Sequence, residues 1–199
     1  MRASNEKIII IDFGSPMNKV LTRKIRELNV YSKLVPPSIT AEEIKNMRPK
    51  GIVLGASPES VYTNKSPKPD PKIFELDVPI LGVCYGLQLI TQFYGGVVDD
   101  TKQNEFGIVE VKADSRNKLF NGLPVYNTAH MRHGDRVKEA PPGFFFLLIH
   151  RAVRLLPLAL RKNRFLVFNS IPKWKQLKTV MIFYGIFYMI YVDVTVNGR

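Results

Sequence analysis

The sequence predicts an α/β fold built on a doubly wound, mostly parallel sheet. Three apolar stretches near the N-terminus, residues 7–13, 30–35 and 50–54, have the length of buried strands. Helical patterns separate them, so strands and helices alternate along the chain. A fourth apolar stretch, residues 78–83, precedes another helical pattern. The order βαβαβ indicates a sheet whose ligands bind beyond the carboxyl ends of the strands.

The connecting segments support this order. Asp12, Gly14 and Ser15 follow the first strand and form a loop, after which we expect a helix at about residues 18–28. A second helix is expected after Thr40, whose hydroxyl would cap it. Each helix thus joins two strands in the way a parallel sheet requires.

Cys84, the single cysteine, has the most specific surroundings in the chain. A lone cysteine beside an apolar strand is more often a core residue than a nucleophile. Gly82 and Gly86, however, flank it at two residues on either side, which favours a sharp turn between strand and helix. The free N–H groups of the following helix would lower the thiol pKa. The pattern therefore predicts a thiol nucleophile.

Residues 82–88, GVCYGLQ, resemble the nucleophile elbow of class I glutamine amidotransferases, and most of all that of the glutaminase domain of GMP synthetases. This resemblance implies the flavodoxin-like form of the fold and hydrolysis of glutamine through a Cys84 thioester. The ammonia would pass to a partner, the ATP-pyrophosphatase domain or subunit of GMP synthetase, for conversion of XMP to GMP in purine biosynthesis.

Other segments extend the resemblance over most of residues 7–145. They are DFGS (residues 12–15) with Asn18, PESVY (residues 58–62) and HGDRV (residues 133–137). The first resembles the opening segment of these amidotransferases, the second resembles the loop after their third strand, and the third resembles a segment near the substrate glutamine.

The resemblance also implies roles for individual residues. The backbone N–H groups of Ser57 and Tyr85 would form the oxyanion hole. Gln88, His133 and Asp135 would line the glutamine pocket. Without the resemblance, the His-Gly-Asp tripeptide would be interpreted as a surface turn.

Two positions depart from the pattern of these amidotransferases. Ala56 and Ser57 stand where two glycines are usual, so a backbone conformation with positive φ would be strained there. Arg132 stands where a serine usually precedes the His-Gly-Asp tripeptide. We expect a weaker oxyanion hole or a more crowded glutamine pocket.

The general base is missing from the printed sequence. The resemblance implies a His-Pro-Glu segment near the end of the domain, but the three histidines are His130, His133 and His150, and the only acid after residue 139 is Asp193. No spacing places His130 or His150 near Cys84. We expect very low activity, because loss of triad members costs several orders of magnitude in rate.

The composition of the chain changes near residue 144. The net charge is +12, of which residues 146–199 carry +8 from nine basic residues and one acid. Read from the third base of each codon, residues 164–174 permit Phe-Gly-Val-Gln-Phe-His-Pro-Glu-Val. The His would straddle the codons of Ser170 and Ile171, and the Glu those of Pro172 and Lys173.

We therefore hypothesise a one-base frame change, in the gene or in its sequencing, within the T-rich codons of residues 144–146. Residues 1–145 would be the amidotransferase domain, and residues 146–199 its frame-shifted remainder, so that the final part of the fold is disrupted. The missing last strand would leave an exposed apolar edge and poor solubility.

A second class of function follows if residues 146–199 are the true product of the gene. Residues 151–164 are rich in Arg, Lys and Leu and would suit an acidic membrane surface, although Pro157 interrupts a helix. Aromatic residues near basic ones would also suit single-stranded nucleic acid. The chain would then be an inactive amidotransferase scaffold with a binding tail.

Cofactor and targeting signals are few. The sequence has no glycine-rich phosphate loop with a following Lys and Ser or Thr, so ATP and Mg²⁺ are expected only on the synthetase partner, and no metal site is expected. The longest apolar run, residues 180–192, has thirteen residues, short of a membrane span. One cysteine excludes an internal disulfide, and the N-terminus does not resemble a signal peptide, so the cytoplasm is the expected location.

Overall fold

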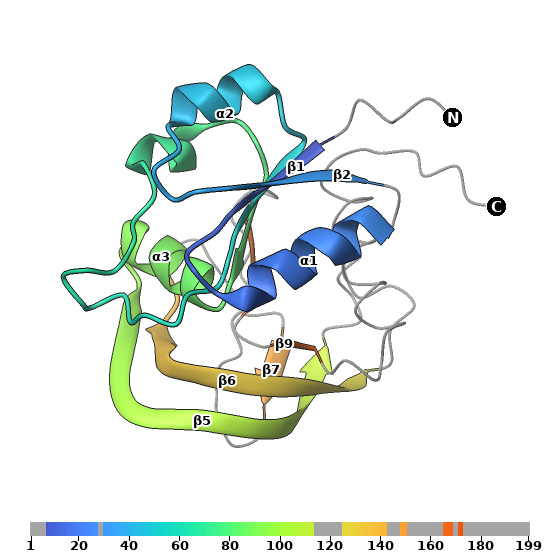
Figure 1. Cartoon of the computed structure of the whole chain (residues 1–199). Coiled ribbons are helices and arrows are strands. Elements are labelled where there is room, and N and C mark those ends of the chain that lie inside the picture. Colours follow the sequence, from blue (N-terminus) through green and yellow to red (C-terminus); the bar gives the residue numbers. More distant parts are fainter. Residues whose placement is uncertain are drawn as a thin grey trace.

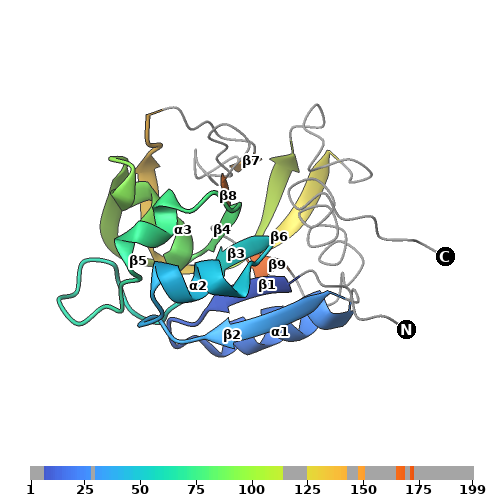
Figure 2. The same cartoon turned by 90° about the horizontal axis from the view of Figure 1, so that it is seen from above.

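A computed structural model describes residues 7–27, 30–113, 125–142, 148–150, 165–168 and 171–172. Within these ranges the central element is a five-stranded parallel sheet with the order β2-β1-β3-β4-β8. Its strands are β1 (Lys7–Ile11), β2 (Tyr31–Val35), β3 (Gly51–Leu54), β4 (Ile80–Val83) and β8 (Phe165–Phe168). In Figure 2, β2 lies beside α1 at one edge of the sheet, and β8 lies beside β4. The predicted α/β fold is confirmed.

The helices that join the strands are α1 (Pro16–Glu27), α2 (Ala41–Met47), the 3₁₀ turn η1 (Pro71–Glu75) and α3 (Tyr85–Phe93). The chain moves from β1 to β2 in one direction and from β2 to β3 in the other, so right-handed crossovers place α1 and α2 on opposite faces. α1 begins two residues before the predicted start, because Pro16 suits the first helical position. Thr40 caps α2 as predicted, with Glu43 completing a capping box.

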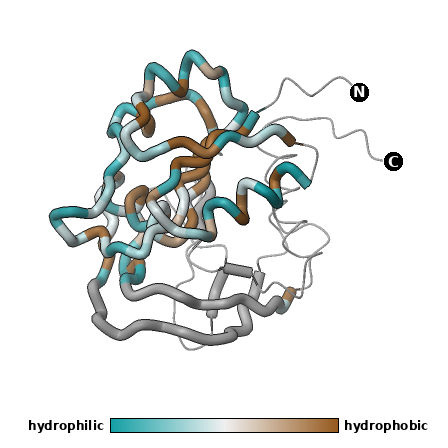
Figure 3. The backbone as a smooth tube through the Cα atoms, in the orientation of Figure 1, coloured by the Kyte–Doolittle hydropathy of each residue, from teal (hydrophilic) through white to brown (hydrophobic). Residues whose placement is uncertain are grey.

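The core lies against both faces of the sheet. Ile9 and Ile11 of β1 belong to one buried cluster with Ile44 of α2. Ile8 and Ile10 alternate with them, are also buried, and lie outside that cluster, as expected for the opposite face of a strand. Figure 3 shows the hydrophobic colour concentrated in the strands of the parallel sheet, whereas α1 and α2 carry both hydrophobic and hydrophilic residues.

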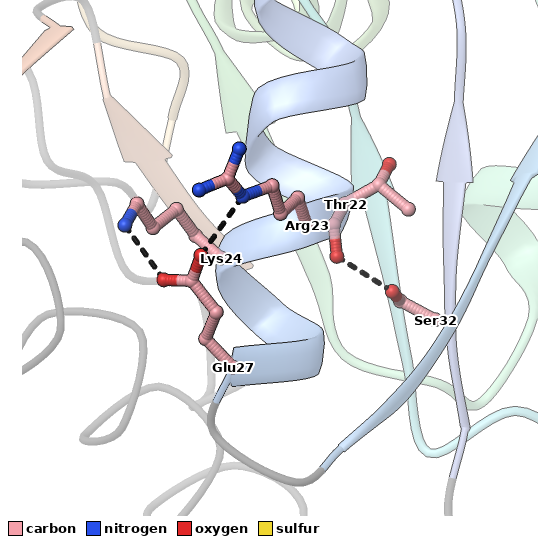
Figure 4. A network of polar contacts seen from close by, with 5 residues as sticks. All are labelled: Thr22, Arg23, Lys24, Glu27 and Ser32. Carbon is pink, nitrogen blue, oxygen red and sulfur yellow. Dashed lines mark hydrogen bonds and ion pairs between the residues drawn. The ribbon is translucent and has the colours of Figure 1, made fainter.

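Polar contacts connect α1 to β2 and also join side chains within α1 (Figure 4). The buried Ser32 hydroxyl donates a hydrogen bond to the Thr22 carbonyl across 2.9 Å. Glu27 accepts from Arg23 at 2.9 Å and from Lys24 at 2.6 Å. The Lys24 hydrogen bond is the largest cause that lowers the pKa of Glu27. Basic residues thus fill the last turn of α1, where they complement the helix dipole.

A second, antiparallel sheet was not predicted. It has the order β7-β5-β6-β9, with β5 (Val97–Ala113), β6 (Tyr126–Glu139), β7 (Leu148–His150) and β9 (Ile171–Pro172). The two long ribbons β5 and β6 run side by side below α1 and α3 in Figure 1. The surface-turn interpretation of residues 133–135 is wrong, because His133 pairs with Glu105 and Asp135 with Asp100 in this ladder. Cross-strand pairing outweighs the local turn preference of Gly-Asp.

The far edge of the parallel sheet also differs from expectation. β8 pairs in parallel with β4 from Ile80 with Phe165 to Val83 with Phe168. The prediction that this edge stays uncovered is therefore wrong. Residues 151–164, the basis of the membrane-surface alternative, lie outside the described residues. Within the described ranges, no helix has the length and apolar character to cross a membrane.

Candidate active site

The predicted elbow is present at the carboxyl end of β4. Cys84 follows Val83 directly and is the N-cap of α3, with φ 50° and ψ −106°. Among the described non-glycine residues only Arg48 and Cys84 have a positive φ. A strained backbone at a side chain between strand and helix is typical of a nucleophile held on a sharp turn.

The two flanking glycines are required by close packing. A Cβ on Gly86 would lie 2.1 Å from the Leu54 carbonyl oxygen, so any side chain there would push α3 away from β3. A Cβ on Gly82 would lie 2.7 Å from the Leu87 nitrogen in the first turn of α3. The predicted reason for both glycines, close backbone approach, is confirmed.

The loop after β3 lies against the elbow. The Gly86 N–H donates to the Gly55 carbonyl at 3.1 Å, which joins the first turn of α3 to the residue that precedes Ala56 and Ser57. Within the described residues, the N–H groups of Ser57 and Tyr85 have no hydrogen-bond acceptor. Two free backbone donors near a thiol are what an oxyanion hole needs.

The strain expected at Ala56 and Ser57 is absent. Neither residue has a positive φ in the described chain. The loop instead follows a path that residues with side chains can adopt. The expectation that replacing glycines strains this backbone is therefore wrong for the conformation seen here.

Gln88 and Asp135, both assigned to the glutamine pocket by the resemblance, lie in contact with each other, and protein groups occupy both side chains. The Gln88 amide donates to the Asp135 carbonyl at 2.9 Å, and both side chains are buried. The Asp135 carboxylate accepts from the Ser60 hydroxyl at 2.6 Å and from the Val61 N–H at 3.3 Å. Asp135 thus connects β6 to the loop that contains Ser57.

The histidines belong to the second sheet. His133 and His130 lie in β6 and His150 lies in β7, whereas Cys84 is at the end of β4 in the parallel sheet. Their side chains, and that of Arg132, lie outside the described part of the structure. Among the described residues, no group of three or more His, Cys, Asp and Glu could hold a metal ion.

The ionisation of Cys84 is opposite to the sequence expectation. Burial raises the pKa of the Cys84 thiol to about 12, whereas the helix N-terminus was expected to lower it. Cys84 is only 6% exposed, and desolvation disfavours the thiolate. The Cys84 thiol is therefore neutral at pH 7 and needs a general base to become a nucleophile.

Sequence reasoning did not identify the contacts of Asn18. This residue of α1 is buried and binds both the N–H and the carbonyl of Ala56. The sequence signal was an asparagine on the buried face of an amphipathic helix, where an apolar residue is usual. Ser60 and Val61, the partners of Asp135, were likewise named only as part of the PESVY segment.

Comparison with known protein families assigns the chain to one of them. The family model "Glutamine amidotransferase class-I" matches residues 9–165, most of the chain. The chain belongs to this family. The match confirms the resemblance found at the elbow of this amidotransferase.

Individual relatives agree with the assignment. A GMP synthase [glutamine-hydrolyzing] of Bacillus subtilis is 50% identical over 140 residues, which is 70% of this chain and 27% of that protein. A GMP synthase of Listeria monocytogenes is 47% identical over 139 residues, again 27% of its length. This amidotransferase chain thus spans about a quarter of the length of these relatives.

A solved structure shows the same fold. It is a GMP synthase component from Thermoplasma acidophilum, with a TM-score of 0.72 at 24% identity. The alignment covers 91% of this chain and 93% of that one. At this low sequence identity, the likeness shows the fold alone.

Proposed function

We propose that this chain is the glutaminase part of a GMP synthase, which hydrolyses glutamine to supply ammonia for the conversion of XMP to GMP. Cys84 carries the proposal: it lies on a strained elbow, between glycines that allow close packing, beside a loop with a free N–H. The relatives named GMP synthase give the substrate class of the synthetase partner. ATP and Mg²⁺ would act on that partner.

The proposed reaction has two steps. The Cys84 sulfur attacks the side-chain amide carbon of glutamine, and the N–H groups of Ser57 and Tyr85 stabilise the resulting oxyanion. The C–N bond breaks, nitrogen takes a proton, and ammonia leaves a glutamyl thioester. Water then attacks the thioester, releases glutamate and returns the proton to sulfur. Gln88, His133 and Asp135 are proposed to border the glutamine.

Both proton transfers need a base that the printed tail does not encode. The position of β8 supports the frame hypothesis. β8 ends at Phe168, the partner of Val83, which directly precedes Cys84. In the offset frame, Gly-Val straddles the codons of β8, and the His codon begins in Ser170, two residues after β8. A chain leaving β8 in that frame would carry the His-Pro-Glu past the elbow.

The deciding experiment measures glutamine hydrolysis by the printed chain and by a version with its tail restored to the offset frame. We expect the restored chain to release ammonia from glutamine. The rate for the printed chain should be lower by several orders of magnitude, because its triad is incomplete. Cys84→Ala in each version is the control and should abolish hydrolysis.

Two other results would change the account. Equal activity of the printed chain would show that another base serves Cys84, and the frame hypothesis would fail. A restored chain that stays inactive when the synthetase part of a relative is added would contradict the glutaminase function itself.

A further inference from the structure

The loop that follows β3 is bound on two sides. On one side, the Gly55 carbonyl accepts from Gly86 of the elbow at 3.1 Å. On the other side, Asn18 Oδ1 accepts from the Ala56 N–H at 2.8 Å, and Asn18 Nδ2 donates to the Ala56 carbonyl at 2.9 Å. Asn18 is only 1% exposed, so water does not compete for these bonds.

A trans peptide converts these contacts into an orientation for Ser57. The Ala56 carbonyl and the Ser57 N–H belong to one peptide group and point in opposite directions, and no peptide bond among the described residues is cis. Because the Ala56 carbonyl points at Asn18, the Ser57 N–H points away from Asn18. The preceding peptide has its carbonyl, from Gly55, on the side of the elbow. The Ser57 N–H is therefore directed towards the elbow side of the loop.

We propose that Asn18 is a positioning residue for the Cys84 site, because it prevents rotation of the peptide between Ala56 and Ser57 and so keeps the Ser57 N–H available to the oxyanion. The inference rests on the proposed glutaminase function. Within the described residues, Asn18 is the single donor to the Ala56 carbonyl. Removing it leaves that peptide without a restraint.

A neighbouring carboxylate fixes the direction of the Asn18 amide. Asp12 Oδ1 accepts from Asn18 Nδ2 at 2.6 Å and also from the Gly14 N–H at 2.9 Å. The Nδ2 group must therefore face Asp12 and the Ala56 carbonyl, which leaves Oδ1 for the Ala56 N–H. Close packing adds to this restraint, since a Cβ on Gly55 would lie 2.4 Å from Asn18 Oδ1.

The test compares three variants of the full printed chain. Asn18→Ala removes both bonds to Ala56. The exchange Asp12→Asn with Asn18→Asp preserves net charge, the contact between positions 12 and 18, and an acceptor for the Ala56 N–H, but it cannot donate to the Ala56 carbonyl. Lys19→Ala, on the exposed side of α1, is the matched control.

Labelling of Cys84 by a chloroketone analogue of glutamine, relative to labelling by chloroacetone, gives the chemical readout. The thiol gives its proton to water, and the sulfur adds to the ketone carbon. The sulfur then bonds to the neighbouring carbon as the C–Cl bond breaks, the carbonyl is restored, and chloride leaves as an anion that needs no general acid. We expect the ratio of the two rates to fall by roughly tenfold or more in Asn18→Ala and in the exchange variant, since an oxyanion donor is lost. Lys19→Ala should label like the unsubstituted chain.

Amide hydrogen exchange at Ala56, whose N–H binds Asn18, gives a second readout that does not depend on glutamine chemistry. We expect faster hydrogen exchange in the double variant Asp12→Asn with Asn18→Asp. Its Ala56 N–H still has an acceptor, but the peptide between Ala56 and Ser57 can rotate. The proposal would be overturned if the double variant had the same labelling ratio and the same rate of hydrogen exchange as the unsubstituted chain. If the unsubstituted chain shows no preference for the glutamine analogue, the proposed function fails, and the exchange rates alone decide whether Asn18 fixes the loop.

Discussion

At the scale of single residues, Cys84 shows which electrostatic effect prevails in this elbow. The N-terminus of a helix typically favours a negative charge by about 0.3–1 kcal/mol. The rise in the pKa of Cys84 from 9.0 to about 12 corresponds to about 4 kcal/mol against the thiolate. Burial therefore outweighs the helix dipole, and the prediction of a lowered thiol pKa failed because sequence alone does not report desolvation.

This balance predicts the pH dependence of Cys84 alkylation. The rate of reaction of the folded chain with iodoacetamide should rise about tenfold per pH unit and reach no plateau below about pH 11, because the thiolate stays a small fraction there. The urea-unfolded chain is the control and should level off near the ordinary pKa of the thiol, 9.0. A plateau near neutral pH in the folded chain would contradict the raised pKa.

The same pKa has a consequence for stability. Between the pKa of the unfolded chain and that of the folded chain, the unfolded state loses its proton first. The free energy of unfolding therefore falls as pH rises through this window, and below it Cys84 makes no pH-dependent contribution.

At the scale of elements, α2 shows how a short helix is stabilised by its ends. The Thr40 hydroxyl accepts from the Glu43 N–H, and the Glu43 carboxylate accepts from the Thr40 N–H at 2.8 Å. Asp70, from the start of η1, accepts from the Ala41 N–H at 2.9 Å and so holds the two helical segments together. The Thr40 backbone bond is the largest cause that lowers the pKa of Glu43.

Thr40→Ala should lower the free energy of unfolding by about 1 kcal/mol, as loss of an N-cap does elsewhere. Ser38→Ala, at an exposed position just before the helix, is the control and should change little. Urea denaturation at pH 7 measures both. Because the pKa of Glu43 is lowered, its contribution is present at pH 7 and is lost as pH falls through the folded-state pKa. Equal stability of the two variants would contradict the capping box.

At the scale of the whole molecule, the edge of the parallel sheet depends on a segment from the C-terminal tail. All four residues of β4 are buried, and β8 supplies their neighbour on the outer side. An uncovered apolar strand edge is a template for aggregation. The tail therefore has a structural role in the printed chain, whatever the origin of its reading frame.

Deleting residues 146–199 should cause aggregation that light scattering detects, at protein concentrations where the full chain stays monodisperse. Leu166→Pro is the matched variant, because it keeps the length and charge of the tail but cannot continue the ladder of β8. We expect both to aggregate. A monodisperse Leu166→Pro chain would show that β8 does not protect β4.

Local sequence patterns determined much of this protein. Buried strands, the cap at Thr40 and the glycine-flanked elbow at Cys84 depend on residues close in the chain, so period, propensity and spacing were sufficient. The family resemblance assigned Gln88 and Asp135 to one pocket, and the two residues are hydrogen-bonded in the fold.

Tertiary structure alone decided the rest. The pairing of β5 with β6, the attachment of β8 to β4 and the contact of Asn18 with Ala56 join residues far apart in the sequence, and no local pattern encodes such distances. The pKa of Cys84 likewise depends on how completely the folded chain excludes water from the thiol. The sequence alone therefore predicted Cys84 as the nucleophile, and the fold decided that this residue is a buried thiol, which would need a base to react.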